Sequence, residues 1–359
     1  MQALILAGGE GTRLRPLTST VPKPVVPLVD RPFMAFMLEW LRGHGVDDVI
    51  MSCGFLAAGV RDVLGDGSAY GMRLRYVEEP RPLGTGGALK FCGSLLDERF
   101  LMLNGDVLTD IDVSTQLAQH ERTGATGTLA LTPVEDPSNY GLVRLAGDDQ
   151  VTEFVEKPAA DQIDTNNISA GCYVLERSVL DLLEQDKPAS IERDVFPRLV
   201  GNGLYGHVAE GYWLDIGTPE RYLEGAFDIL EGTVRSSVRA HVAEGVENAG
   251  RVVEPVLVED GCRIGAGARV GGRAILERGV TVGENTVIER SVVLRGAEIG
   301  ANCVLRGCVV GGGVRIGDRC HVEGLAVLGE GVTVGDDNML SNGVRVFPGV
   351  SLPDGAIRF

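Results

Sequence analysis

The stretch Met1–Pro24, MQALILAGGEGTRLRPLTSTVPKP, decides how the first part of the chain is interpreted. It begins with an apolar run, Ala3 to Ala7, that has the length and content of a buried strand. Glycines follow at once, and backbone without Cβ atoms can approach a phosphate closely and present successive N–H groups to it. The glycines and the cations behind them are Gly8, Gly9, Gly11, Arg13, Arg15 and Lys23. The pattern predicts a strand followed by a polyphosphate-binding loop, stiffened by prolines.

The composition limits the classes of protein to consider. A chain of 359 residues can bury a substantial core, and two domains are expected. Its net charge of −17 disfavours nucleic acid as a partner. The seven cysteines include no C-x-x-C pair, which is typical of reduced thiols in a cytoplasm. We see no signal peptide and no apolar run near the ~20 residues of a membrane span, so we expect a cytoplasmic protein without a membrane partner.

Strand and helix patterns alternate through the first 231 residues. Strands are expected at 48–53, 74–77, 100–103, 128–132, 151–155 and 169–175, and helices at 33–42, 60–64, 83–90, 191–200 and 220–231. This order predicts an α/β, Rossmann-like domain with a mainly parallel sheet. Ligands of such sheets bind beyond the carboxyl ends of the strands, where the glycine loop and Asp106 both fall.

From about residue 250 an apolar residue followed by glycine recurs. The pairs begin at Ile264, Val282, Ile299, Ile316 and Val334, in steps of 18, 17, 17 and 18 residues. Near-matches between them suggest a unit of about six residues and a coil of about 18, typical of a left-handed parallel β-helix of hexapeptide repeats. We therefore expect a catalytic domain at 1–231, a connecting segment at 232–250 and a β-helix at 251–359 that makes the protein a homo-oligomer.

The whole opening string resembles the signature of the sugar-1-phosphate nucleotidylyltransferases, G-G-x-G-T-R-L-x-P-L-T followed by P-K-P. Here it reads Gly8 to Thr18 and then Pro22-Lys23-Pro24, and we call Gly8–Pro24 the signature loop. The resemblance implies transfer of a nucleotidyl group from a nucleoside triphosphate to a sugar 1-phosphate, with release of pyrophosphate. The nucleophile is then a substrate phosphate, so the enzyme must orient two anions in line and screen their repulsion, with Mg²⁺ as cofactor.

The resemblance also implies roles for individual residues. Arg13, Lys23 and Asp106 would be catalytic, and Asp106 and Asp215 would hold the metal. The nucleotide would be bound by Leu6, Ala7, Gly8, Gly9, Gly11, Thr12, Arg13, Glu79, Gly84 and Thr85. The sugar phosphate would be bound by Gly141, Glu156, Lys157, Asn167, Ala170 and Gly171.

The base is predicted from Glu79, at a position where thymidylyl- and uridylyltransferases commonly carry glutamine. A carboxylate only accepts hydrogen bonds, so it suits the adjacent N1–H and N2–H₂ donors of guanine. The string E-E-P-x-P-L-G-T-x-G around it also resembles mannose-1-phosphate guanylyltransferases. GTP and mannose 1-phosphate are therefore favoured.

Three alternatives remain open from the sequence. The enzyme could be a glucose-1-phosphate thymidylyl- or uridylyltransferase. The chain could be a non-catalytic regulatory relative, although such relatives tend to lose the opening loop. The β-helix could itself be an acyltransferase, but His321 is the only histidine after residue 241 and no long insertion interrupts the coils.

Overall fold

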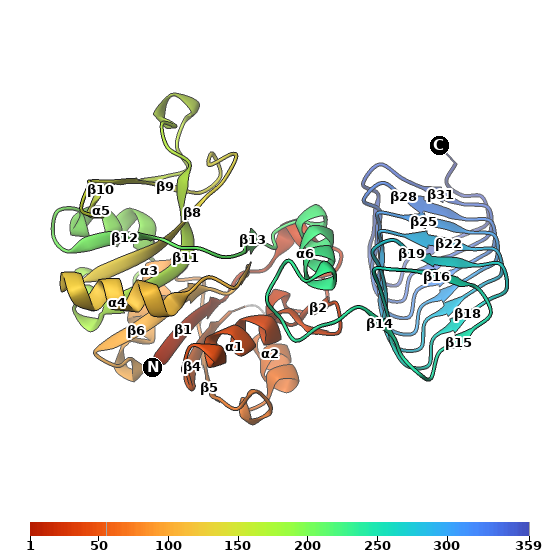
Figure 1. Cartoon of the computed structure of the whole chain (residues 1–359), viewed down its shortest axis with the longest axis horizontal. Coiled ribbons are helices and arrows are strands. Elements are labelled where there is room, and N and C mark those ends of the chain that lie inside the picture. Colours follow the sequence, from red (N-terminus) through yellow and green to blue (C-terminus); the bar gives the residue numbers. More distant parts are fainter. Residues whose placement is uncertain (55, 359) are drawn as a thin grey trace. The chain divides into compact units, whose positions relative to one another are not determined.

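The computed structural model describes residues 1–54 and 56–358 of the chain. It forms two compact units, and the signature loop is divided between them. Figure 1 shows the sheet of the first unit and the stacked strands of the β-helix, coloured along the sequence. The first unit contains Met1–Glu10 and Met34–Trp213, and the second contains Gly11–Phe33 and Leu214–Phe359. The domain boundaries predicted from the sequence do not include this division of the loop.

The first unit is built on a nine-stranded sheet in which β10, β9, β11, β6, β1, β4 and β5 lie in that order and β8 joins β11 to β12. The strands are β1 (Gln2–Ala7), β4 (Asp48–Cys53), β5 (Arg73–Glu78), β6 (Arg99–Asn104), β8 (Gly127–Pro133), β9 (Gly141–Leu145), β10 (Val151–Glu156), β11 (Asn167–Glu176) and β12 (Leu204–Val208). The predicted α/β fold is confirmed, with a sheet that is mixed. The strands β6, β1, β4 and β5 are parallel, whereas β11 runs antiparallel to β6, β8 and β9.

Helices connect these strands and short elements complete the unit. The helices are α1 (Phe33–Gly43), α2 (Ala57–Leu64), α3 (Gly84–Phe91), α4 (Val113–Thr123) and α5 (Phe196–Leu199), with the short strand β7 at Val107–Thr109. The expected helix 191–200 begins as a π-helical turn, η7 (Ile191–Val195), before α5. Central strands are buried on both faces, so β1 and β6 read as continuous apolar runs.

The second unit contains the signature loop from Gly11 onward, helix α6 (Pro219–Glu231) and the β-helix. The loop holds two 3₁₀ turns, η1 (Thr12–Leu14) and η2 (Lys23–Val25), and the small strand pair β2 (Pro27–Leu28) and β3 (Arg31–Pro32). Helix α6 begins at the N-cap Thr218, whose hydroxyl accepts a hydrogen bond from the amide of Arg221, and ends at Gly232 with φ of 79°.

The predicted β-helix is confirmed as three parallel sheets whose strands alternate along the chain. We name each sheet by its first strand. The β14 sheet contains β14 (His241–Val242), β17 (Val256–Val258), β20 (Ala274–Leu276), β23 (Val292–Val293), β26 (Val309–Val310), β29 (Val327–Leu328) and β32 (Arg345–Val346). The β15 sheet contains β15 (Glu247–Asn248), β18 (Arg263–Ile264), β21 (Thr281–Val282), β24 (Glu298–Ile299), β27 (Arg315–Ile316), β30 (Thr333–Val334) and β33 (Ser351–Leu352). The β16 sheet contains β16 (Arg251–Val253), β19 (Arg269–Gly271), β22 (Val287–Glu289), β25 (Val304–Arg306), β28 (His321–Glu323) and β31 (Met339–Leu340).

The first coil begins earlier than the sequence repeat indicates. Strands β14 and β15 lie inside the segment 232–250, where we expected only a connection, and they pair with β17 and β18. Their side chains are exposed, so this coil lacks the apolar-glycine pairs that reveal the later ones.

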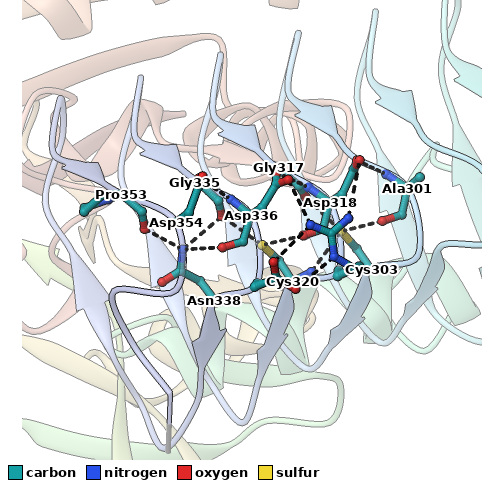
Figure 2. A network of polar contacts seen from close by, with 12 residues as sticks. Ala301, Cys303, Gly317, Asp318, Cys320, Gly335, Asp336, Asn338, Pro353 and Asp354 are labelled. Carbon is teal, nitrogen blue, oxygen red and sulfur yellow. Dashed lines mark hydrogen bonds and ion pairs between the residues drawn. The ribbon is translucent and has the colours of Figure 1, made fainter.

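Consecutive coils are joined at one corner by a ladder of aspartates (Figure 2). The carboxylates of Asp318, Asp336 and Asp354 accept hydrogen bonds from the backbone amides of Ala301, Asp318 and Asp336, one coil earlier, at 2.8 to 2.9 Å. Inside the corner the buried Asn338 donates to the carbonyls of Gly335 and Pro353, both at 2.9 Å. From Ala301 to Asp354, the turns of this corner are therefore fixed to one another by side-chain hydrogen bonds as well as by the sheets.

Candidate active site

The glycine turn after β1 lies directly beside Glu79. Leu6 and Ala7 end β1 in register with Ser52 and Cys53 of β4. A Cβ atom built on Gly8 would lie 3.2 Å from Oε1 of Glu79, whereas one on Gly9 would meet nothing within 4 Å. The structure thus brings a carboxylate to the turn predicted to bind phosphate, and it leaves space in front of Gly9.

The carboxylate of Glu79 is held in place by two donors of the first unit. The hydroxyl of Ser52 donates to its Oε1 at 2.9 Å, and the amide of Leu83 donates to its Oε2 at 3.2 Å. A carboxylate oxygen accepts more than one hydrogen bond, so each can still receive one from a base. The sequence did not indicate this contact of Ser52 with Glu79, because a serine inside an apolar strand gives no signal of a site.

Asp106 follows a close crossing of the backbone at the end of β6. Gly105 donates its amide to the carbonyl of Leu6 at 2.9 Å, and a Cβ there would approach that oxygen to 2.6 Å. Only glycine permits this approach. Because β6 is parallel to β1 and next to it, Asp106 and the Gly8 turn both leave the sheet at carboxyl ends, as predicted.

Helix α3 begins at two of the predicted nucleotide-binding residues. Gly84 has φ of 71°, and a Cβ would approach the carbonyl oxygen of Ala189 to 2.6 Å. The hydroxyl of Thr85 donates to Glu192 at 2.7 Å and accepts from the amide of Ile191 at 2.9 Å. These contacts tie α3 to η7, so Thr85 supports the backbone of this region with its side chain.

The predicted sugar-phosphate residues gather around strands β9, β10 and β11. Gly141 pairs with Glu156 across the two strands, and a Cβ on Gly141 would clash with Phe154 at 2.5 Å. Lys157 follows with φ of 53° and donates its amide to the carbonyl of Tyr140 at 3.0 Å. The exposed lysine and half-buried Glu156 thereby share one turn.

Strand β11 contributes the remaining predicted contacts. Trp213 donates its indole N–H to the carbonyl of Ala170 at 2.8 Å and meets Tyr140 edge to face. Gly171 has φ of 70° and lies against Asn104, where a Cβ would be 2.8 Å from Nδ2. Asn167 starts the strand, paired with Pro133 of β8. Tyr140 and Trp213 therefore support the sugar-side residues, and the sequence reading had given them no such role.

Burial and a second carboxylate raise the pKa of Glu156. Desolvation is the main cause, and the negative charge of Glu192 adds to it, whereas Lys157 and Arg193 lower the pKa. A glutamate in these surroundings gains from hydroxyl donors such as those of a sugar, because they stabilise its ionised form.

The second unit carries the cations of the signature loop and Asp215, at the end of β13 (Trp213–Asp215). Gly11 has φ of 61°, and its carbonyl accepts a hydrogen bond from Thr18 at 2.7 Å. A Cβ on Gly11 would lie 3.2 Å from Cβ of Lys23, whose residue is only 8 % exposed. The turn thus packs tightly against the stem of Lys23, and Thr12 is exposed at the start of η1.

Arg13 reaches Asp215 within this unit. Its Nη2 lies 3.7 Å from Oδ2 of Asp215, and the arginine side chain is 66 % exposed. A Cβ on Gly217 would come within 2.8 Å of that nitrogen and 3.1 Å of that oxygen. Gly217, in the W-x-D-x-G string, therefore leaves the room in which this arginine and aspartate meet.

The residues fit a magnesium ion by their donor chemistry. Asp106 and Asp215 offer hard carboxylate oxygens, and Mg²⁺ is commonly bound through one or two carboxylates with substrate phosphates and water. Among residues 1–54 and 56–358, three or more potential metal-binding side chains do not cluster anywhere.

The structure also places His321 and the seven cysteines. His321 lies in β28 with its side chain 45 % exposed and 3.9 Å from Glu323. The seven cysteines are free and buried, and burial raises the pKa of several of them, for example Cys53 and Cys308 to about 12. Within the described residues, every helix is too short or too polar to cross a membrane.

Comparison with known proteins bears on this arrangement. The nucleotidyl transferase family matches residues 2–232, most of the chain, and a family described as the GMPPB C-terminal domain matches residues 252–354. The chain belongs to the nucleotidyl transferase family. This nucleotidyl transferase is 42 % identical to the mannose-1-phosphate guanylyltransferase of Mycobacterium tuberculosis, over 100 % of the chain and 98 % of the relative. It is 36 % identical to the mannose-1-phosphate guanylyltransferase catalytic subunit beta of Danio rerio, over 99 % and 98 %.

A solved structure resembles the nucleotidyl transferase part. The crystal structure of HddC from Yersinia pseudotuberculosis complexed with GMP-PN is 29 % identical, with a TM-score of 0.56, over 64 % of this chain and 99 % of that one. The resemblance first drawn from the signature loop is thus confirmed for both parts of the chain, and the protein is an enzyme of the nucleotidyl transferase type.

Proposed function

We propose that this protein transfers the guanylyl group of GTP to mannose 1-phosphate, forming GDP-mannose and pyrophosphate. The observation that carries the choice of base is the carboxylate of Glu79, fixed beside the Gly8 turn by Ser52 and Leu83. The names of the relatives from Mycobacterium tuberculosis and Danio rerio support the same pair of substrates.

In the proposed reaction an oxygen of the sugar phosphate attacks the α-phosphorus of GTP. The new P–O bond forms as the bond between the α-phosphorus and the bridging oxygen to the β-phosphate breaks, and pyrophosphate leaves with that electron pair. Amides of the glycine turn would bind phosphate oxygens, and Arg13 and Lys23 would stabilise the charge on the leaving group. No protein nucleophile is required, so positioning and charge stabilisation supply the catalysis.

Each substrate would be oriented by a separate set of residues. Glu79 would accept from N1–H and N2–H₂ of guanine, beside Gly84 and Thr85 at the start of α3. Lys157 would bind the sugar phosphate, and Glu156 would accept from sugar hydroxyls near Gly141. Asn167, Ala170 and Gly171 would complete that side.

Asp106 and Asp215 would hold Mg²⁺, which when bound neutralises phosphate charge during the transfer. The two carboxylates would bind the metal, and the metal would bind the nucleotide phosphates. Arg13 would orient Asp215 by pairing with it.

The proposal includes the cellular location and the oligomeric state of the enzyme. Buried free thiols support a reducing cytoplasm, and exposed apolar side chains on the last coils, Phe347 and Val350, support a homo-oligomer formed through the β-helix. Sedimentation equilibrium of the full chain and of a Phe347→Ser, Val350→Ser variant tests whether the protein is a homo-oligomer formed through the β-helix.

Pyrophosphate release from each of the four common NTPs and dTTP, with mannose or glucose 1-phosphate and with or without Mg²⁺, tests the function. GTP with mannose 1-phosphate and Mg²⁺ should give the highest kcat/KM. A higher rate with dTTP or UTP would contradict the base assignment, and no turnover with any pair would contradict the proposed activity.

Glu79→Gln tests the base reader directly. Glutamine offers one donor and one acceptor, which match N3–H and O4 of a pyrimidine, so the ratio of kcat/KM for GTP over UTP should fall about a hundredfold. Glu78→Gln, at the exposed neighbouring residue, is the matched control and should leave the ratio unchanged. An unchanged ranking in the Glu79 variant would show that another group reads the base.

A further inference from the structure

One outer face of the β-helix is buried although it points away from the helix interior. Along the β14 sheet the outward residues stack in register, and neighbouring residues such as Val258 and Leu276 point into the core. Each of the outward residues is 0 % exposed, and they are Leu257, Ile275, Val292, Val309 and Val327. The next residue in this row is Arg345 of β32.

Contacts within the second unit show which segments lie along this face. Helix α6 meets the earlier coils, where Glu231 pairs with Arg273 at 2.7 Å and Phe227 lies under the guanidinium of Arg290 at 5.9 Å. The signature loop meets the later coils, where Thr20 donates to Glu330 at 3.2 Å. Residues that flank strands of the β14 sheet therefore contact both α6, which follows Asp215, and the signature loop, which carries Arg13.

Arg345 makes the most direct connection between the last coil and the loop. Its Nη1 donates to the carbonyl oxygens of Arg13 and Arg15, at 2.8 and 2.9 Å. A single guanidinium nitrogen thus holds a carbonyl in the middle of the short turn η1 and the carbonyl of its C-cap residue, Arg15. A permanently charged donor makes stronger hydrogen bonds to carbonyls than a neutral one does.

The position of the Arg13 backbone controls where its side chain can reach. That side chain is 66 % exposed, so packing restrains it little, and its Nη2 lies 3.7 Å from Asp215. A long flexible side chain loses less entropy on binding a phosphate when its backbone is already fixed. A shift of the turn would therefore reduce the pre-organisation of a proposed catalytic cation.

We propose that Arg345 is a positioning residue for catalysis: the last coil of the β-helix holds the signature loop in the conformation that presents Arg13 to the triphosphate. This inference rests on the proposed function for its kinetic effect. The β-helix then serves the active site of its own chain, in addition to any role in assembly.

A double-mutant cycle measures the connection between the two arginines. Arg345→Met should lower kcat/KM for GTP about tenfold to a hundredfold, and Arg345→Lys should recover part of this loss, because an ammonium can also donate to carbonyls. In an Arg13→Met background, Arg345→Met should cost less than about threefold, since the group that it positions is gone. Arg315→Met, at a 70 % exposed arginine of the β15 sheet, is the matched control and should leave the rate unchanged.

Amide exchange provides a readout that does not depend on turnover. The amides of Leu14, Arg15 and Leu17 are hydrogen-bonded within the loop and should exchange at least tenfold faster in Arg345→Met, with unchanged exchange in β1. The proposal would be overturned if Arg345→Met lowered kcat/KM by the same factor with and without Arg13. Unchanged amide exchange in the loop would also overturn it. Loss of turnover in the unmodified enzyme with every substrate pair would instead overturn the proposed function, and the exchange result would still decide whether Arg345 holds the loop.

Discussion

Replacing Glu277 by glutamine should stabilise the protein in a pH-dependent manner. Glu277 follows β20 and is only 5 % exposed, and its Oε2 accepts from the amide of Arg295 at 3.0 Å. Burial raises its pKa from 4.5 to about 7, and the negative charges of Glu259 and Asp30 add to the effect, while Arg295 opposes it.

The sign follows from the higher proton affinity of the folded state. Between pH 4.5 and 7 the folded protein binds this proton more tightly than the unfolded chain, so its stability falls as the pH rises through that window. At about 1.4 kcal/mol for each pH unit, the ionised carboxylate destabilises the folded protein by about 3 kcal/mol at pH 8 and by almost nothing at pH 4.5. Glutamine resembles the protonated acid and carries no such penalty.

Urea unfolding of both proteins at several pH values checks this expectation. The free energy of unfolding of Glu277→Gln minus that of the unmodified protein should grow by about 3 kcal/mol from pH 4.5 to 8. Glu298→Gln, at a glutamate whose side chain is 61 % exposed, is the control and should show no such growth. A difference that stays constant with pH would refute the argument, because it would mean that Glu277 titrates alike in both states.

Two other substitutions separate chemistry from stability. Gly217→Ala places a methyl group 2.8 Å from Nη2 of Arg13. Because that nitrogen ends a flexible side chain and can move away, kcat/KM should fall about a hundredfold while the unfolding midpoint changes little. A large loss of stability would contradict this expectation. Asn338→Ala removes two hydrogen-bond donors and the oxygen that accepts from the amide of Ile357 at 2.9 Å. The free energy of unfolding should fall by about 3 kcal/mol, with GTP turnover retained at low temperature. Unchanged urea unfolding of this variant would contradict the expectation.

The sequence predicted the features that depend on local pattern. The apolar-glycine steps revealed the coils because each coil buries one side chain at the same place, and the opening string revealed the signature loop. The pattern failed at β14 and β15, where the coil is exposed and polar. It predicted a helix at 191–200 but did not indicate that this helix begins as the π-helical turn η7, where Glu192 accepts a hydrogen bond from the hydroxyl of Thr85, 107 residues earlier.

Contacts between distant segments explain the remaining differences. An arginine in the repeat looks like any solvated outward residue, so nothing near Arg345 indicates that it meets Arg13, 332 residues earlier. The carboxylate of Glu79 was expected to face a base, but its support by Ser52 depends on the register of β4, which no motif records. The roles of Arg13, Lys23, Asp106 and Asp215 stay predictions.

The bond between Arg345 and the loop gives this protein a particular order of completion. A ribosome makes the loop at the start of synthesis and its anchor near the end, so every residue proposed to touch substrate exists long before the anchor does. A chain that stops one coil short would carry the whole set of binding side chains and still lack the restraint on the loop. Premature termination and proteolytic trimming at the carboxyl end should therefore slow the enzyme before they unfold it.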